Sequence, residues 1–244
     1  MILIMDFQKY VETVIIVNEF SGCSNKIKIG KINDQYVASK FVHDEKTRLN
    51  EISILKKLNH SNIVKYLYES NGEFYMTGIR YGLTLHDYFI RRNDNIDLKS
   101  CIDILYQISD ALSYIHSLNI IHHDVKDKNI LFDFSNNKIL ICDFGLAEIA
   151  DENGQGDIAT KSFGTWIAPE QTNNITPITN KIDVYCFGIL SNEIFIKGRT
   201  SQDYFKICDG IVAKIAFLCQ ENNPDDRPTM DQIKFMYEKI RKFK

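Results

Sequence analysis

The spacing of apolar residues changes partway along this chain of 244 residues. Before about residue 80, segments such as 25–42 are rich in β-branched and aromatic residues, a composition that is typical of strands. Beyond that point, apolar residues recur every three or four positions, which is the period of an amphipathic helix. This order predicts a small sheet-rich part followed by a larger part that is mainly helical.

Residues 45–58 interrupt the strand-like composition with a helical pattern. Their apolar side chains recur every three positions, at Leu49, Ile52, Leu55 and Leu58. This spacing favours a helix with one apolar face. Segments 63–70 and 73–79 are then predicted to be strands, because the Asn-Gly pair at 71–72 is a strong hairpin signal. The first part is therefore expected to be a sheet with one main helix.

Three segments of the larger part are predicted to be helices. Residues 100–118 carry one apolar stripe, and residues 230–243 are amphipathic. Residues 183–196 are apolar nearly all round, which predicts a buried central helix. A boundary near residues 79–82 would act as a hinge between the two parts, and ligands favour clefts at such boundaries.

Composition and charge argue against several classes of protein. With 44% hydrophobic residues, the chain can bury a core, and we do not expect disorder. The formal net charge is −3 and both signs are interleaved, so neither a nucleic-acid partner nor a membrane surface is indicated. No apolar run suits a signal peptide or a membrane-spanning helix, so we expect no membrane insertion and an intracellular, cytoplasmic location. The oligomeric state stays open.

The six cysteines form no CxxC pair, which argues against a zinc site. We interpret them as reduced, buried side chains that act as small hydrophobic groups. Cys142 keeps a second interpretation, as a reactive thiol, because it directly precedes Asp143 in a segment with other polar residues.

Polar residues stand inside apolar surroundings in three separate fragments. These are VASK at 37–40, HDVKDKN at 123–129 and CDFG at 142–145. Buried charges without partners are costly, so the three fragments are expected to meet one another or a ligand. Segments 130–133 and 138–142 are predicted to form a hairpin, which would return the third fragment beside the second.

The side chains of these fragments suit phosphoryl transfer. Asp143 would lie beside Asn129, and a carboxylate with an amide oxygen suits a hard divalent cation such as Mg²⁺. Lys126 would neutralise a phosphate, and Asp124 would accept a proton from an incoming hydroxyl group. Phosphoryl transfer depends on such positioning and charge neutralisation.

Seven motifs, in this order, resemble those of eukaryotic protein kinases. They are YVASK at 36–40, NEISILKKLNHSNIV at 50–64, HHDVKDKNIL at 122–131, DFG at 143–145, GTWIAPE at 164–170, DVYCFGIL at 183–190 and NPDDRPTM at 223–230. A single such motif occurs by chance, but seven in a fixed order leave little room for coincidence. Small-molecule kinases share the lysine and the paired acids but, as a family, do not carry the last three motifs together.

The resemblance implies an α+β, two-lobed protein kinase fold in a single domain, 1–244. A small β-rich N-lobe with one main helix would span residues 1–78, and a hinge would span 79–82. A larger, mainly helical C-lobe would span 83–244. The implied cofactors are ATP and Mg²⁺, with Mn²⁺ as an alternative, and the implied partner is a protein substrate.

The same resemblance implies roles for residues that bind the nucleotide. Lys40 would contact the α- and β-phosphates of ATP and would pair with Glu51, only eleven positions further on, which is short for the family. Gly22 would belong to the glycine-rich loop, and Ile27 would cover the adenine. Whether the short connection holds the Lys40–Glu51 pair closed or strains it stays open.

The motifs at 122–131 and 143–145 would carry the catalytic and metal-binding residues. The resemblance makes Asp124 the catalytic base and places Lys126 on the transferring phosphate. Asn129 and Asp143 would bind the metal ion.

The activation segment would follow Asp143. Its candidate residues are Gly145, Thr160, Ser162, Thr165 and Glu170. Thr160 and Ser162 are positioned for phosphorylation, and Glu170 would form a structural ion pair with Arg227. Lys126 and Thr165 match residues that are typical of serine/threonine kinases. Segments 183–190 and 219–230 resemble the corresponding segments of the tyrosine-kinase-like branch of that class. The implied function is transfer of the γ-phosphate of MgATP to serine or threonine hydroxyls of proteins.

The chain also departs from the family pattern. Phe20 and Asn25 replace two of the three expected glycines, and glycine lets backbone amides approach a phosphate closely. The hinge is one residue shorter than usual and lacks its common acid. These departures keep a second interpretation open, in which the chain is a catalytically weak pseudokinase that acts as a nucleotide- or partner-binding scaffold.

Two histidines precede the candidate base. His122 takes the place of the family's structural histidine and is expected to pack near Phe144. His123 takes the place of an arginine that commonly binds a phosphate on the activation loop. A neutral histidine binds phosphate poorly, so we expect activity that does not depend on activation-loop phosphorylation.

Overall fold

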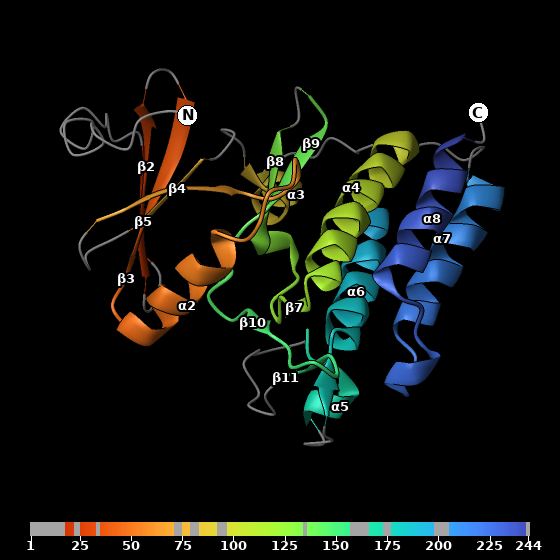
Figure 1. The fold of residues 1–244 in the computed structure, drawn as a ribbon. Helices are drawn as coiled ribbons and strands as arrows, with labels where there is room; N and C mark the ends of the chain where they lie inside the picture. The colour runs from red at the N-terminus through yellow and green to blue at the C-terminus, as the bar shows by residue number, and fades with distance from the viewer. Residues whose placement is uncertain are drawn as a thin grey trace.

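The computed structural model describes residues 18–21, 25–32, 35–70, 75–78, 83–91, 97–133, 136–156, 166–172, 177–197 and 205–242. A sheet with one long helix precedes a larger, mainly helical part, as the sequence predicts (Figure 1). The β8–β9 hairpin (Ile130–Asp133 and Lys138–Ile141) lies between the sheet and the bundle of long helices in Figure 1.

The first part is a five-stranded antiparallel sheet in the order β1-β2-β3-β5-β4. Its strands are β1 Asn18–Ser21, β2 Asn25–Ile32, β3 Gln35–Val42, β4 Lys65–Glu69 and β5 Tyr75–Gly78. The central strand β3 places Lys40 opposite Ile27 on one side and Tyr75 on the other. Lys40 therefore lies on the middle strand of the sheet, where its backbone is held by both neighbours.

Among the described residues, helix α2 (Glu45–Leu55) is the one long helix that packs with the sheet. The Asp44 side chain caps it by accepting a hydrogen bond from the Thr47 amide at 2.7 Å. The predicted apolar face is wrong in one position, because Leu49 is 48% exposed. Steps of three residues fall behind a helical turn of 3.6, so Leu49 rotates away from the face that buries Ile52 and Leu55.

The larger part contains the remaining described elements. Its helices are α3 Leu85–Arg91, α4 Leu98–Ser117, α5 Pro169–Thr172, α6 Lys181–Lys197, α7 Phe205–Cys219 and α8 Met230–Lys242, with 3₁₀ turns η2 Asp127–Asn129 and η3 Pro224–Asp226. Besides β8 and β9, its short strands are β6 Leu83–Thr84, β7 Ile120–Ile121, β10 Glu148–Ile149, β11 Gln155–Gly156 and β12 Ile178–Thr179. Within the described ranges, no helix is both long and apolar enough to cross a membrane.

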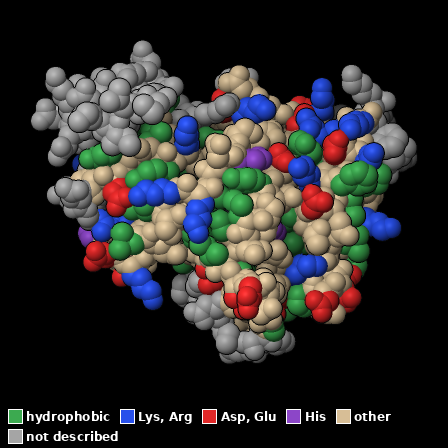
Figure 2. Space-filling model, viewed as in Figure 1, with side chains coloured by type: hydrophobic (Ala, Val, Ile, Leu, Met, Phe, Trp, Pro, Cys, Tyr) green, Lys and Arg blue, Asp and Glu red, His purple; other side chains and the backbone are tan. Residues whose placement is uncertain are grey.

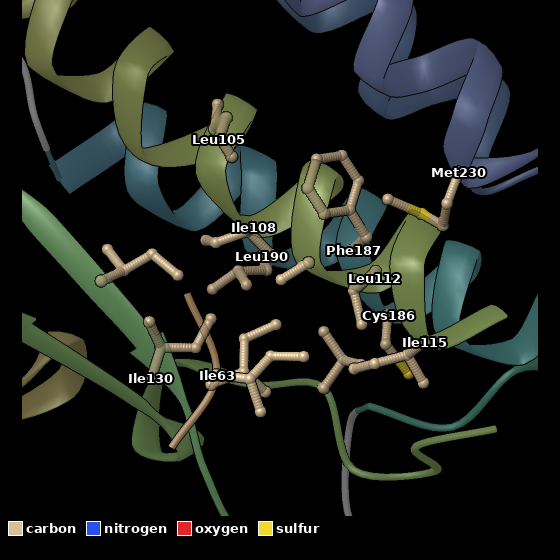
Figure 3. Packing of buried hydrophobic residues seen from close by; sticks show 14 of the residues in the cluster. Ile63, Leu105, Ile108, Leu112, Ile115, Ile130, Cys186, Phe187, Leu190 and Met230 are labelled. Carbon is tan, nitrogen blue, oxygen red and sulfur yellow. The ribbon is translucent and has the colours of Figure 1, made fainter. Parts of the chain in front are cut away.

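Helix α6 is the buried central helix that its composition predicts. Phe187 and Leu190 of α6 pack among side chains of α4, such as Ile108 and Leu112, and Met230 of α8 lies at the edge of the same cluster (Figure 3). Helices α4, α6, α7 and α8 lie side by side in Figure 1. On the face drawn in Figure 2, Lys and Arg side chains are interspersed with Asp and Glu side chains.

The close approach of α6 and α7 gives a test of the packing. A Cβ atom added at Gly188 would lie 2.7 Å from the Cβ of Cys219 and 2.9 Å from the carbonyl oxygen of Ala216. Gly188→Ala must therefore push the two helices apart, and we expect it to lower the free energy of unfolding by about 1–3 kcal/mol.

Gly210→Ala in α7 is the matched control, because a Cβ atom there meets nothing within 4 Å. Alanine is the better helix former by roughly 0.5–1 kcal/mol, so this variant should be slightly more stable than the wild type. Chemical denaturation measures both effects. Equal changes in the two variants would contradict the α6–α7 contact.

Candidate active site

The loop that carries Asp124 lies between β7 and β8, after the end of α4 at Ser117. The predicted hairpin is present, since β8 and β9 pair antiparallel with Ile130 opposite Ile141. The Cys142 amide donates to the carbonyl oxygen of Asn129 at 3.0 Å. The hairpin therefore brings the segment that contains Asp143 back to the loop that contains Asn129.

Lys40 lies between two carboxylates. Its Nζ donates to both oxygens of Glu51 at 2.9 and 3.0 Å and to Oδ1 of Asp143 at 2.6 Å. The Phe144 amide donates to Oε1 of Glu51 at 3.1 Å, so the helix carboxylate also binds the segment that follows Asp143. The eleven-residue connection thus accommodates a closed Lys40–Glu51 pair.

These contacts determine the charges of Lys40 and Asp143. Burial by itself disfavours the ammonium form of Lys40, but the carboxylates of Asp143 and Glu51 outweigh it and raise the Lys40 pKa. Burial likewise opposes ionisation of Asp143, yet the charge and hydrogen bond of Lys40 lower the Asp143 pKa overall. Lys40 is therefore a cation and Asp143 an anion at neutral pH.

Asn50 adds a contact that sequence reasoning missed. Its Nδ2 donates to the carbonyl oxygen of Ala147 at 2.7 Å, so α2 is bonded to the chain beyond Gly145 as well as to Phe144. A polar residue before Glu51 carries no local signal of this role, because its partner is 97 residues away.

The candidate base is held by its neighbours on the loop. Lys126 Nζ lies 2.7 Å from both carboxylate oxygens of Asp124. Asn129 Nδ2 donates to the backbone oxygen of Asp124 at 2.8 Å and to its Oδ2 at 2.7 Å. The acid, the cation and the amide of this loop therefore form one hydrogen-bonded group.

The donor set around Asp143 fits a metal that shares its ligands with a substrate. Within the described ranges, no cluster of three or more His, Cys, Asp or Glu side chains could hold a metal ion by itself. Mg²⁺ is usually bound through one or two carboxylates together with substrate phosphates. Asp143, whose side chain is 42% exposed, has an accessible carboxylate, and the amide oxygen of Asn129 on the neighbouring loop could serve as a second ligand.

A buried carboxylate on α6 holds the backbone of the loop. The His122 and His123 amides donate to the two oxygens of Asp183 at 2.8 and 2.9 Å, and His116 Nε2 lies 2.9 Å from its Oδ2. Burial raises the pKa of Asp183, but the hydrogen bond and charge of His116 outweigh it and lower the pKa overall. Asp183 is the first residue of the motif at 183–190, but the motif does not indicate which groups its carboxylate binds.

The two histidines have different surroundings. His122 packs against Phe144 with ring centroids 4.8 Å apart, as expected, and burial lowers the pKa of His122. His123 is 2% exposed, and its Nε2 lies 2.7 Å from Oε1 of Glu148 on β10. Sequence reasoning did not identify Glu148.

Glu170 of α5 and Arg227, which follows η3, form a bidentate ion pair. Arg227 donates to the two carboxylate oxygens at 2.6 and 2.7 Å, and to the carbonyl oxygens of Glu221 and Lys181 at 2.8 and 2.9 Å. Both side chains are buried, so the pair connects α5 to the chain before α8 without exposure to solvent.

Other candidate residues are placed only in part. Gly22, Thr160, Ser162, Thr165 and the hinge at 79–82 lie outside the described residues. Gly145 lies against Asp143 and Glu51, since an added Cβ would be 3.3 and 3.5 Å from their oxygens. Burial raises the pKa of the Cys142 thiol to about 12, so the reactive-thiol interpretation of Cys142 is not supported.

The contacts of Asp183 predict an acid-sensitive stability. Asp183→Asn should lower the free energy of unfolding by roughly 2–4 kcal/mol at neutral pH, because charge-assisted hydrogen bonds are lost. The folded-state pKa of Asp183 lies below its ordinary value of 3.8, so its contribution is present above that pH and is lost as the pH falls through the lowered pKa.

The free energy of unfolding, measured by denaturation between neutral and acidic pH, tests this prediction. The difference between wild type and Asp183→Asn should narrow in acid. The exposed Asp225→Asn is the control and should give a small difference at every pH. A difference for Asp183→Asn that does not change with pH would contradict the assigned contacts.

Comparisons with known proteins agree with these observations. A family model described as "Protein kinase domain" matches residues 21–238. The chain is 28% identical over 257 residues to "Probable serine/threonine-protein kinase kinX" of Dictyostelium discoideum, covering 92% of this chain and 23% of that protein. It is 36% identical over 160 residues to "Mitogen-activated protein kinase 3" of Arabidopsis thaliana, covering 62% and 42%.

A relative of another specificity is equally similar. The chain is 30% identical over 217 residues to "Tyrosine-protein kinase SRK3" of Spongilla lacustris, covering 78% of this chain and 63% of that protein. In each of these three comparisons the match covers less than two thirds of the relative's own length.

Proposed function

The chain belongs to the protein kinase domain family, and from that premise we propose that it is an active serine/threonine protein kinase. The carrying observation is the closed group of Lys40, Glu51 and Asp143. In it the buried lysine of the sheet is charged and lies next to the carboxylate that would bind the metal. In this proposal, residues 1–78 are the N-lobe, 79–82 the hinge and 83–244 the C-lobe.

Lys40 is proposed to bind the α- and β-phosphates of ATP. Glu51 keeps the ammonium group of Lys40 charged. When the nucleotide binds, Lys40 can therefore exchange its contact with Asp143 for a contact with the phosphates. Gly22 and Ile27 are proposed to lie over the nucleotide. When bound, Mg²⁺ or Mn²⁺ supplies charge neutralisation for the phosphates, and Asp143 and Asn129 would hold it.

Asp124 is proposed to be the catalytic base. It takes the proton of the incoming hydroxyl group, whose oxygen forms a bond to the γ-phosphorus while the bond to the bridging oxygen breaks and ADP leaves. Lys126, 2.7 Å from Asp124, is close enough to contact the same transferring phosphate. Positioning and charge neutralisation supply most of the rate in this chemistry.

Serine/threonine specificity is supported by Lys126 and by the similarity to the Dictyostelium relative, which is named a probable serine/threonine-protein kinase. The similarity to a tyrosine kinase makes tyrosine the competing acceptor. Phosphoamino-acid analysis of a phosphorylated protein substrate distinguishes the two, because the serine/threonine proposal requires that phosphotyrosine is not the main product.

Active-site substitutions test the proposed chemistry. Asp124→Asn should lower kcat by roughly 10²–10⁴-fold, the usual contribution of a general base, while ATP still binds. Asp143→Asn should abolish transfer of radiolabelled phosphate to a generic protein substrate supplied with Mg²⁺ or Mn²⁺. Asp225→Asn is the control. If folded wild type transfers no more phosphate than Asp143→Asn, the proposal of an active kinase is wrong.

The second candidate is a pseudokinase that binds nucleotide or a partner without efficient transfer. Phe20 lies in β1 opposite Ile27, at a place where the family has a glycine. If the protein transfers no phosphate, thermal-shift titration with MgATP shows whether it binds nucleotide. Stabilisation by MgATP would indicate a nucleotide-binding pseudokinase.

Activity is further proposed not to depend on phosphorylation of the activation segment, because His123 stands where the family has an arginine. Thr160→Ala and Ser162→Ala should each change the rate of phosphate transfer little. Steady-state rates of the two variants and of the double variant check this, and a large loss of rate would refute it.

A further inference from the structure

We propose that Glu148 is a positioning residue for the catalytic loop, and that its carboxylate occupies the role that an activation-loop phosphate has beside an arginine. This inference rests on the proposed kinase function and names the group that makes phosphorylation unnecessary. Its basis is the geometry of His123, Glu148 and Gly156.

Backbone pairing brings Glu148 to the loop. Strand β10 pairs antiparallel with β7, and Glu148 lies opposite Ile121, two residues before His123. This register places Oε1 of Glu148 2.7 Å from Nε2 of His123. The histidine side chain is 1% exposed and the glutamate side chain 14% exposed, so solvent screens this contact little.

The residue that Glu148 contacts is held in an unfavourable backbone conformation. His123 has a φ of 65°, which is uncommon for a residue other than glycine. Such conformations are strained and persist only where the surroundings enforce them. The His123 amide donates to Asp183 at 2.9 Å, and the His123 ring is hydrogen-bonded to Glu148. The residue directly before Asp124 is therefore held through both its backbone and its side chain.

The chain that follows closes over this contact. Gly156 of β11 lies so close that an added Cβ would be 2.0 Å from Oε1 of Glu148 and 3.0 Å from Cδ1 of Ile121. Strand β11 is itself paired with β12, where Gly156 lies opposite Ile178. The absence of a side chain at 156 therefore allows the later chain to cover the carboxylate while it is bonded to His123.

The residue before Glu148 extends the connection to the N-lobe helix. The carbonyl oxygen of Ala147 accepts the hydrogen bond of Asn50 on α2. Of these two consecutive residues, Ala147 is bonded to the helix that carries Glu51, and Glu148 is bonded to the loop that carries Asp124. A phosphate group placed beside His123 would meet the Glu148 carboxylate, and like charges at that distance repel.

Glu148→Gln, which keeps the size of the side chain and removes its charge, tests the proposal on phosphatase-treated protein. Misplacement of a catalytic group by about 1 Å can cost as much as 10²-fold, so we expect kcat to fall by roughly 10–100-fold. The KM for ATP should stay near the wild-type value, because the contacts of Lys40 and Glu51 are unchanged. Glu152→Gln is the control, since Glu152 is exposed and only four residues away.

A double-mutant cycle distinguishes positioning from unrelated losses. His123→Ala and Glu148→Gln should each lower kcat, and the double variant should be about as slow as the slower single variant. The proposal would be overturned if the fold losses of kcat in the two single variants multiplied in the double variant. It would also be overturned if the kcat of Glu148→Gln equalled that of Glu152→Gln.

Amide hydrogen exchange keeps the test independent of activity. Residues 122–125 should exchange faster in Glu148→Gln than in wild type or Glu152→Gln. If wild type transfers no phosphate but this difference is present, the proposed kinase activity fails and the positioning contact stands. If exchange in Glu148→Gln equals that of the control, the positioning contact itself is wrong.

Discussion

The carboxylate of Asp183 is the contact on which the arrangement of the loop that carries Asp124 depends. It is buried on α6, the helix at the centre of the hydrophobic core, and it accepts the amides of His122 and His123. A buried charge is tolerated only when its hydrogen bonds are satisfied, and His116 completes the set. The backbone directly before Asp124 is thereby bonded to a helix whose side chains Val184, Phe187 and Leu190 are buried in the core.

Charge pairing joins the sheet to helix α2 and to the segment that follows β9. Lys40 on the central strand binds Glu51 of α2, eleven positions further on, and Asp143 of the chain after β9, 103 positions further on, so one ammonium group links three segments. Asn50 and Glu148 extend the same connection through residues 147 and 148. Helix α2, the segment that contains Asp143 and the loop that contains Asp124 are therefore held in one arrangement by groups of the chain itself.

Sequence patterns predicted the parts of this arrangement that are local or periodic. The sheet-then-helix order, the β8–β9 hairpin and the buried helix α6 follow from apolar spacing, and the motifs identified the protein kinase domain. Leu49 was misplaced because a three-residue repeat only approximates a helical face. Asn50, Asp183 and Glu148 acquire their roles from partners 25 or more residues away, and spacing along the chain carries no signal for such contacts.

The central claim is that this chain assembles a working phosphotransferase site without phosphate on its activation segment. Time-resolved intact-mass spectrometry tests it most directly, when phosphatase-treated protein is mixed with MgATP and a protein substrate. The account predicts that the substrate gains phosphate without a lag, while the protein itself is still unphosphorylated. A lag that ends only when the protein has gained phosphate would contradict the account.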